Sequence, residues 1–228
     1  MKTLADSNLP ALGRLADAFE ADKDVCVDSS YEILREIEHR KQHRPAPMVV
    51  ALDGGSGAGK STLAARLERC IDAVIVPLDD FFAADTPDWE WETRSIAERA
   101  RDVFDWQRLR VDALEPLRAG RRARWYPFDF AAGLDHQGTY RLSKQPVERH
   151  PASVIILDGA YSASPEIADL VDFAVLVDVP THIRHKRLSE RENEEFLQRW
   201  HAIWDEVERY YFTEVRPGSS FDLVISGH

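Results

Sequence analysis

The segment LDGGSGAGKST, from Leu52 to Thr62, constrains the fold of this chain more than any other feature. Its glycine-rich centre comes directly after the apolar run MVVALD at 48–53 and directly before a helical pattern at 60–71. A buried strand, a tight glycine loop and a helix in this order form the first unit of an α/β fold. The segment therefore predicts a strand, a loop and a helix that meet at one edge of a sheet.

The same segment predicts a loop that binds phosphate. It fits the pattern G-x-x-x-x-G-K-[ST], in which backbone N–H groups and a helix N-terminus point at phosphate oxygens. The ammonium of Lys60 would neutralise β- and γ-phosphate charge, and the hydroxyl of Ser61 would ligate Mg²⁺. We therefore expect ATP and Mg²⁺ as cofactors. The predicted nucleotide-binding residues are Gly54, Gly55, Ser56, Gly57, Ala58, Gly59, Lys60, Ser61 and Thr62.

Further apolar runs predict the rest of the sheet. Segments rich in Val, Ile and Leu alternate with helical patterns and lie at 73–79, 153–159, 173–179 and 221–226. Continuous apolar strands of this kind are typical of parallel sheets that helices cover on both faces. The predicted fold class is therefore α/β, a three-layer P-loop NTPase fold with a parallel central sheet, over residues 46–228.

Two regions fall outside the alternating pattern. Residues 1–45 contain helical patterns at 4–20 and 29–43, and the prolines of RPAP end the second one, which predicts an N-terminal helical extension. An insertion at about 83–150, rich in Trp, Arg and Asp, separates the second core strand from the third. Within it we expect a helix at 95–118, a small hairpin of RARWYPFDF with GTYRLS, and the binding site for the acceptor.

Acidic residues end two of the predicted strands beside the loop. Asp158 could hold Mg²⁺ together with Ser61, and the alternative is an ordinary Asp-Gly turn. Asp79 ends the second core strand at the carboxyl edge of the sheet, where open α/β sheets bind ligands. Its carboxylate could accept the proton of an attacking hydroxyl and help to hold the metal. We expect the neighbouring Asp80 to cap a turn or to support the site from behind.

These motifs together resemble the uridine kinase and phosphoribulokinase family of small-molecule kinases. VALDGGSGAGKSTLA resembles the nucleotide loop of that family, and VIILDGAY resembles the segment of its metal-associated acid, here Asp158. The resemblance implies that Asp79, in LDDFF, is the catalytic base and that Asp105, in VFDWQRL, holds ribose hydroxyls. It also implies a role near the nucleobase for Phe128 and Tyr126, in YPFDF.

A segment that resembles the family's lid follows at about 181–200 and carries Arg184, Arg187 and Arg191. Spacings of three and four put these arginines on one helix face. Arg184 and Arg187 are predicted to close over the phosphates and substrate and to offset transition-state charge. The alternative is a solvated face paired with nearby glutamates, and for Asp105 the alternative is an ordinary helix N-cap.

The resemblance implies an enzyme that transfers the γ-phosphoryl group of ATP to a hydroxyl of a small molecule. The leading acceptor is a nucleoside such as uridine or cytidine. The segment AAGLDHQG offsets His136 from the histidine of uridine kinases, and the lid lacks their arginine-glycine-arginine-aspartate run. Pantothenate, ribosylnicotinamide, glycerate and sugars therefore stay as alternative acceptors. A regulatory NTPase that acts on a partner protein is the rival from another class.

Composition excludes several other classes. The net charge of −11 argues against nucleic acid as a partner. We expect no membrane partner, because no window approaches 18 apolar residues and no secretory apolar block precedes residue 25. The two cysteines lack the spacing of a metal site or a disulfide framework, which favours the cytoplasm. A homo-oligomer stays open.

Overall fold

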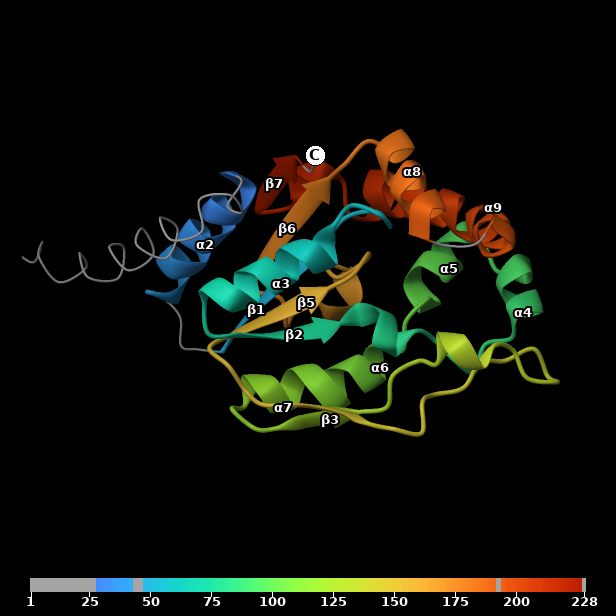
Figure 1. Cartoon of the computed structure of the whole chain (residues 1–228), viewed down its shortest axis with the longest axis horizontal. Helices are drawn as coiled ribbons and strands as arrows, with labels where there is room; N and C mark the ends of the chain where they lie inside the picture. The colour runs from blue at the N-terminus through green and yellow to red at the C-terminus, as the bar shows by residue number, and fades with distance from the viewer. Residues whose placement is uncertain (1–27, 43–46, 192–193, 227–228) are drawn as a thin grey trace, which may run out of the picture.

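A five-stranded parallel sheet forms the centre of the computed structural model, which describes residues 28–42, 47–191 and 194–226. The strand order is β2-β5-β1-β6-β7, and every neighbouring pair is parallel (Figure 1). This sheet confirms the predicted fold class. The strands are β1 (Met48–Asp53), β2 (Ala73–Pro77), β5 (Val154–Asp158), β6 (Phe173–Asp178) and β7 (Leu223–Ser226).

Helices α2 (Asp28–Lys41) and α3 (Lys60–Cys70) cover one face of the sheet. Ile33 and Ile37 of α2 are fully buried in the same hydrophobic cluster as Leu52 of β1 and Leu67 of α3. Helix α2 is therefore part of the core of the sheet. The boundary of the extension at residue 45 stays a prediction, and the helix expected at 4–20 lies outside the described residues.

The opposite face is covered by α5 (Ile96–Asp102), by the π-helical segment η2 (Leu109–Leu114) and by α9 (Glu194–Tyr210) with its continuation η5 (Tyr211–Val215). Leu109 and Tyr211 from this layer are buried against Val76 and Leu157 of the sheet. The sheet thus lies between two helical layers. The other helical elements are η1 (Leu78–Phe81), α4 (Asp88–Thr93), α6 (Trp106–Arg108), α7 (Glu115–Arg118), η3 (Phe130–Ala132), η4 (Pro165–Ile167), α8 (Thr181–Arg191) and η6 (Gly218–Ser220).

The segment predicted to be helical at 95–118 forms two helical pieces. The chain leaves α5 after Asp102 and starts again at Trp106, and the second piece passes through η2 before α7. Pro116, at the start of α7, has no N–H to donate to the preceding turn, so a regular α-helical ladder cannot run through it. A π-helical turn is one of the usual ways in which a helix accommodates such a break.

The hairpin in the insertion also differs from the prediction. Strand β3 (Ala123–Trp125) pairs antiparallel with β4 (Val147–Arg149), so Trp125 lies opposite Val147. The expected partner, GTYRLS, pairs with the end of the predicted segment through one bridge between Phe128 and Leu142 and two backbone hydrogen bonds beside it. Trp125 is 1% exposed and belongs to the core cluster beneath the sheet, so β3 is attached to the core through this side chain.

Within these described ranges, no helix is both long and apolar enough to span a bilayer.

Candidate active site

The carboxyl edge of the sheet brings the predicted catalytic segments together. Asp158 of β5 lies between Leu52 of β1 and Pro77 of β2 in the strand register. The glycine-rich loop begins directly after β1, and Asp79 follows two residues after β2. Strand β2 ends at Pro77, earlier than predicted, and Asp79 lies exposed in the 3₁₀ turn η1.

The loop adopts backbone conformations that require its glycines. Gly54, Gly57 and Gly59 have φ angles of +143°, +81° and +91°, which L side chains rarely adopt. A Cβ atom at Gly54 would also lie 2.5 Å from the carbonyl oxygen of Val177, so the loop passes directly against β6. Helix α3 then begins at Lys60, with Gly59 as its N-cap residue.

Lys60 lies inside the loop and is 8% exposed. Its ammonium donates hydrogen bonds of 2.8 Å to the carbonyl of Gly54 and 3.1 Å to that of Gly55. The same positive charge stabilises the ionised carboxylate of Asp158. A buried cation next to a positive-φ glycine loop and a helix N-terminus is an arrangement suited to an anion with several oxygens.

Asp158 and Ser61 provide oxygen atoms that suit a magnesium ion. Burial raises the pKa of Asp158, and a hydrogen bond from Ser61 and the charge of Lys60 offset part of that increase. The Oδ1 atom of Asp158 is buried and has no hydrogen-bond partner within the described structure. Hard carboxylate and hydroxyl oxygens are the ligands that Mg²⁺ prefers, so the residues fit this ion.

Sequence reasoning missed Asp53, the last residue of β1. Its fully buried carboxylate accepts hydrogen bonds from the N–H groups of Gly54 (2.7 Å), Tyr161 (2.8 Å) and Ala163 (3.0 Å), and from the hydroxyl of Tyr211 (2.8 Å). Burial raises the pKa of Asp53, and these hydrogen bonds oppose the increase.

Asp53 thus joins three segments that approach the site. One of them is the segment after β5, in which Tyr161 adopts a left-handed conformation with φ of +69°. The sequence did contain a signal for Asp53, which is an acidic residue at the end of an otherwise apolar strand. When such a strand is central and buried, the carboxylate needs hydrogen-bond donors.

Helix α8, the predicted lid, contacts the loop directly. The guanidinium of Arg184 donates to the carbonyl of Ser56 at 3.0 Å, and that of Arg187 donates to the carbonyl of Gly57 at 3.2 Å. Arg184 also forms a 2.7 Å ion pair with Glu208 of α9, whose other oxygen accepts the N–H of Ser56 at 2.8 Å. Side-chain exposures of 11% and 14% show that this ion pair is largely buried.

Arg184 and Glu208 therefore brace the loop from outside. The resemblance provided no signal for Glu208, since this residue lies beyond the lid segment predicted at about 181–200. The side chain of Arg191 lies outside the described part of the chain.

The residues of the segment LDDFF make different contacts. The carboxylate of Asp80 accepts a 2.7 Å hydrogen bond from the indole N–H of Trp125, and burial raises the pKa of this aspartate. Asp80 thus supports the insertion, and η1 has no side-chain N-cap hydrogen bond. Phe81 is fully buried and packs on Trp125. These neighbours hold η1 so that the exposed Asp79 stays at the sheet edge.

Gly159 lets η1 approach the end of β5. A Cβ atom at this position would lie 2.6 Å from the Cβ atom of Leu78, the residue before Asp79. Real Cβ atoms do not approach so closely, so any larger residue would move η1. The glycine of the Asp-Gly pair after β5 therefore controls the position of the predicted base.

Asp105 caps a helix. Its carboxylate accepts the N–H of Arg108 at 2.9 Å as the N-cap of α6, and its side chain is 46% exposed. Arg108 in turn donates to the carbonyls of Asp80, Phe82 and Tyr126. Sequence reasoning missed this arginine, because its partners come from two segments that lie far from it in the chain.

Aromatic rings form the wall of the insertion next to η1. Phe128 is 9% exposed and packs on Phe82, Phe130 and Tyr140 with centroid distances of 5.6, 4.5 and 4.8 Å. Tyr126 is 40% exposed and stacks with the guanidinium of Arg124. Of the two predicted ring contacts, Phe128 is thus mainly packed within the wall, and Tyr126 presents its ring to solvent.

A family model described as the phosphoribulokinase / uridine kinase family matches residues 49–211 of the chain. Curated relatives include the uridine kinase of Borrelia hermsii, 25% identical over 191 residues, which span 79% of this chain and 87% of the relative. The uridine kinase of Lactobacillus johnsonii is 26% identical over 181 residues, 75% of this chain and 78% of the relative.

Solved structures share the fold. A candidate fructose transport system kinase from Silicibacter sp. TM1040 superposes with a TM-score of 0.62 at 22% identity, over 88% of this chain and all of that one (100%). A possible uridine kinase from Bacillus stearothermophilus gives a TM-score of 0.59 at 17% identity, over 95% of this chain and 100% of that one.

The family model spans more than half of the chain, including the loop, Asp79, Asp158 and helix α8. The chain therefore belongs to the phosphoribulokinase / uridine kinase family and is a small-molecule kinase.

Proposed function

We propose that the protein transfers the γ-phosphoryl group of ATP to a hydroxyl group of a nucleoside such as uridine or cytidine. The observation that carries this proposal is the shared sheet edge, where the glycine loop, Asp158 and the segment of Asp79 meet in the register of β1, β5 and β2. The names of the uridine kinase relatives support a nucleoside as the acceptor.

In the proposed reaction the loop amides and Lys60 bind the phosphate oxygens of ATP, after Lys60 exchanges its hydrogen bonds with Gly54 and Gly55 for phosphate oxygens. Ser61 and Asp158, with Asp79 beside them, would hold Mg²⁺. That ion supplies positive charge against the β- and γ-phosphate oxygens. Arg184 and Arg187 keep the loop in place from the side of α8.

Asp79 then accepts the proton of the acceptor hydroxyl as its oxygen forms a bond to the γ-phosphorus. The bond from that phosphorus to the β–γ bridging oxygen breaks, and ADP leaves. Asp105, Tyr126 and Phe128 would orient the acceptor. As the compartment we propose the cytoplasm, where cysteines stay reduced.

A panel of acceptors tests the proposal. ADP release would be measured with uridine, cytidine, pantothenate, ribosylnicotinamide, glycerate and a sugar, each with wild type and with Asp79→Asn. We expect a nucleoside to stimulate turnover, and Asp79→Asn to lower the stimulated rate by about 10²–10⁴-fold. The exposed Asp85, in the same insertion, provides the matched control, Asp85→Asn, which should retain the rate.

Two results would redirect the proposal. Stimulation by another alcohol of the panel would retain the kinase and replace the nucleoside. An ATPase rate that no acceptor changes, and that Asp79→Asn leaves unaltered, would favour a regulatory NTPase.

A further inference from the structure

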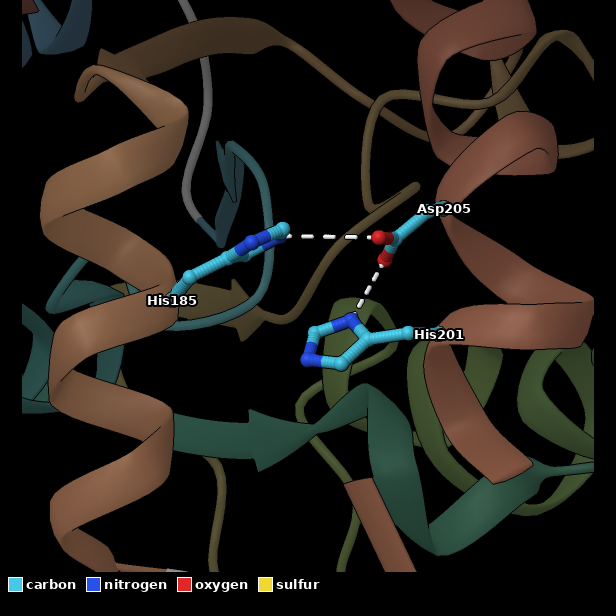
Figure 2. A group of neighbouring side chains, drawn as sticks. All are labelled: His185, His201 and Asp205. Carbon is cyan, nitrogen blue, oxygen red and sulfur yellow. Dashed lines mark hydrogen bonds and ion pairs between the residues drawn. The ribbon is translucent and has the colours of Figure 1, made fainter. Parts of the chain in front are cut away.

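Three side chains with metal-binding atoms meet where α8 contacts α9. His185 projects from α8 toward His201 and Asp205 of α9 (Figure 2). One ligand atom from each residue lies within 4.8 Å of the other two. Asp205 Oδ1 is 2.7 Å from His201 Nδ1, and Asp205 Oδ2 is 3.6 Å from His185 Nε2. The arrangement is thus a single cluster rather than three separate surface groups.

The chemistry of these donors suits a divalent transition metal. Two imidazole nitrogens and one carboxylate oxygen are a ligand set found for Zn²⁺ and for other first-row ions. Ligands at about 2.0–2.2 Å from a tetrahedral ion lie about 3.4 Å from one another. The two distances from Asp205 lie on either side of this value and all three ligand atoms are within 4.8 Å of one another, so side-chain rotations would close the site.

The position of the cluster allows an ion to enter. His201 and Asp205 are four residues apart, so they share one face of α9, and His185 faces them from α8. The side chains of His185, His201 and Asp205 are 38%, 27% and 44% exposed. They line a cavity of about 710 Å³ between the end of β6, α8 and α9. Water in this cavity could complete the coordination of an ion that three protein ligands hold.

We propose that His185, His201 and Asp205 form a binding site for a divalent transition-metal ion of the Zn²⁺ class, which links α8 to α9. The site is separate from the proposed magnesium site at Ser61 and Asp158. It lies one helical turn from the ion pair of Arg184 with Glu208, because Arg184 precedes His185 and Glu208 follows Asp205 by three residues. A bound ion would therefore hold the lid helix on α9 at the same end as that ion pair.

Metal binding to the full-length, nucleotide-free chain tests the proposal. Zn²⁺ would be titrated by calorimetry, and Co²⁺ would be followed by its visible absorption, in a background in which Cys26 and Cys70 are replaced by serine. We expect one ion per chain, a rise in Tm with Zn²⁺, and affinity losses of at least about tenfold in His185→Ala and in His201→Ala.

Matched variants separate this site from other metal sites. His182 is exposed on α8 one turn before His185, and His182→Ala should bind Zn²⁺ as tightly as the parent chain. Asp158→Asn should likewise retain Zn²⁺ binding. Circular dichroism in EDTA would establish that each variant is folded.

The proposal would be overturned by the absence of Zn²⁺ and Co²⁺ binding to the parent chain, or by equal affinity in the parent, His185→Ala and His201→Ala. Either result would reduce the cluster to the hydrogen bond between His201 and Asp205, with the ring of His185 packed on that of His201. Loss of binding in Asp158→Asn alone would assign the ion to the phosphate side.

Discussion

The phosphate side and the acceptor side of this kinase are built in different ways. On the phosphate side, backbone groups of one continuous segment form the site, and positive-φ glycines, Lys60 and the start of α3 follow one another along the chain. On the proposed acceptor side, side chains from separate segments meet, and Arg108 and Trp125 both join η1 to the segment around Tyr126.

This difference explains why one side is recognisable from a short motif and the other is not. A loop that binds phosphate through its backbone needs particular residue types at adjacent positions. An acceptor pocket needs only a suitable shape, which many combinations of aromatic and polar residues can produce. The predictions below separate the two sides by experiment.

The largest expected effect is on the phosphate side. Lys60→Ala removes the buried ammonium and should lower turnover by at least about 10²–10³-fold. Kinetic assays with saturating acceptor would measure it, and circular dichroism would check the fold. Lys144→Ala, at an exposed lysine, is the control. A Lys60→Ala chain that does not fold would mean that the bonds of Lys60 to the loop carbonyls are structural.

A pair of glycine variants should separate the two sides. In Gly57→Ala, φ of +81° and a contact of 2.7 Å with the carbonyl oxygen of Arg184 should distort the loop and weaken ATP binding in calorimetry. In Gly159→Ala, the clash with Leu78 should move Asp79 and lower kcat by about 10²-fold, while ATP still binds.

Gly120→Ala is the control for the glycine pair, because φ there is +66° but nothing lies within 4 Å of the added Cβ atom. Equal loss of ATP affinity in Gly57→Ala and Gly159→Ala would show that the two sides are not independent.

The hydrogen bond from Trp125 to Asp80, which attaches the insertion to η1, should contribute to the stability of the protein. Trp125→Phe removes the N–H donor of Asp80 and should lower the unfolding free energy by about 1–3 kcal/mol, measured by urea denaturation. Unchanged stability would mean that the hydrogen bond adds little to the packing of the ring.

Asp80→Asn should instead raise the free energy of unfolding at neutral pH. Burial raises the pKa of Asp80, so the folded state binds its proton more tightly than the unfolded chain. The stabilising contribution of Asp80 in the wild type is therefore complete below the unfolded pKa of about 3.9, and it is lost as the pH rises through the folded pKa. The variant should be more stable than wild type at pH 7, with the difference gone near pH 3. Urea titrations at both pH values would measure this, and a constant difference would contradict it.

The smallest expected effect distinguishes the two roles of Asp105. Asp105→Ser retains an N-cap for α6 but removes the carboxylate, so stability should change by only a few tenths of a kcal/mol. If the carboxylate also orients the acceptor, the KM for the acceptor should rise about tenfold, the effect of 1.4 kcal/mol. Steady-state kinetics would measure the KM, and an unchanged KM would restrict Asp105 to capping.

Local pattern explains the successes and failures of the sequence analysis. The strand at 48–53, the helix at 60–71 and the glycine loop between them were predicted closely, because each depends on its own residues. The interruption of the helical segment after Asp102 and the pairing of β3 with β4 were not predicted, because both depend on contacts with distant segments, such as the bridge between Phe82 and Phe104. The roles of Asp79, Arg184 and the acceptor residues stay predictions.

The sequence by itself determined the parallel α/β fold, the phosphate loop and the acidic residues beside it, since periodicity and glycine spacing encode these features locally. Only the tertiary structure decided that Asp53 joins three segments, that Glu208 braces the loop with Arg184, and that His185 meets His201 and Asp205. These contacts join residues from different elements, and their geometry follows from how the helices pack on the sheet.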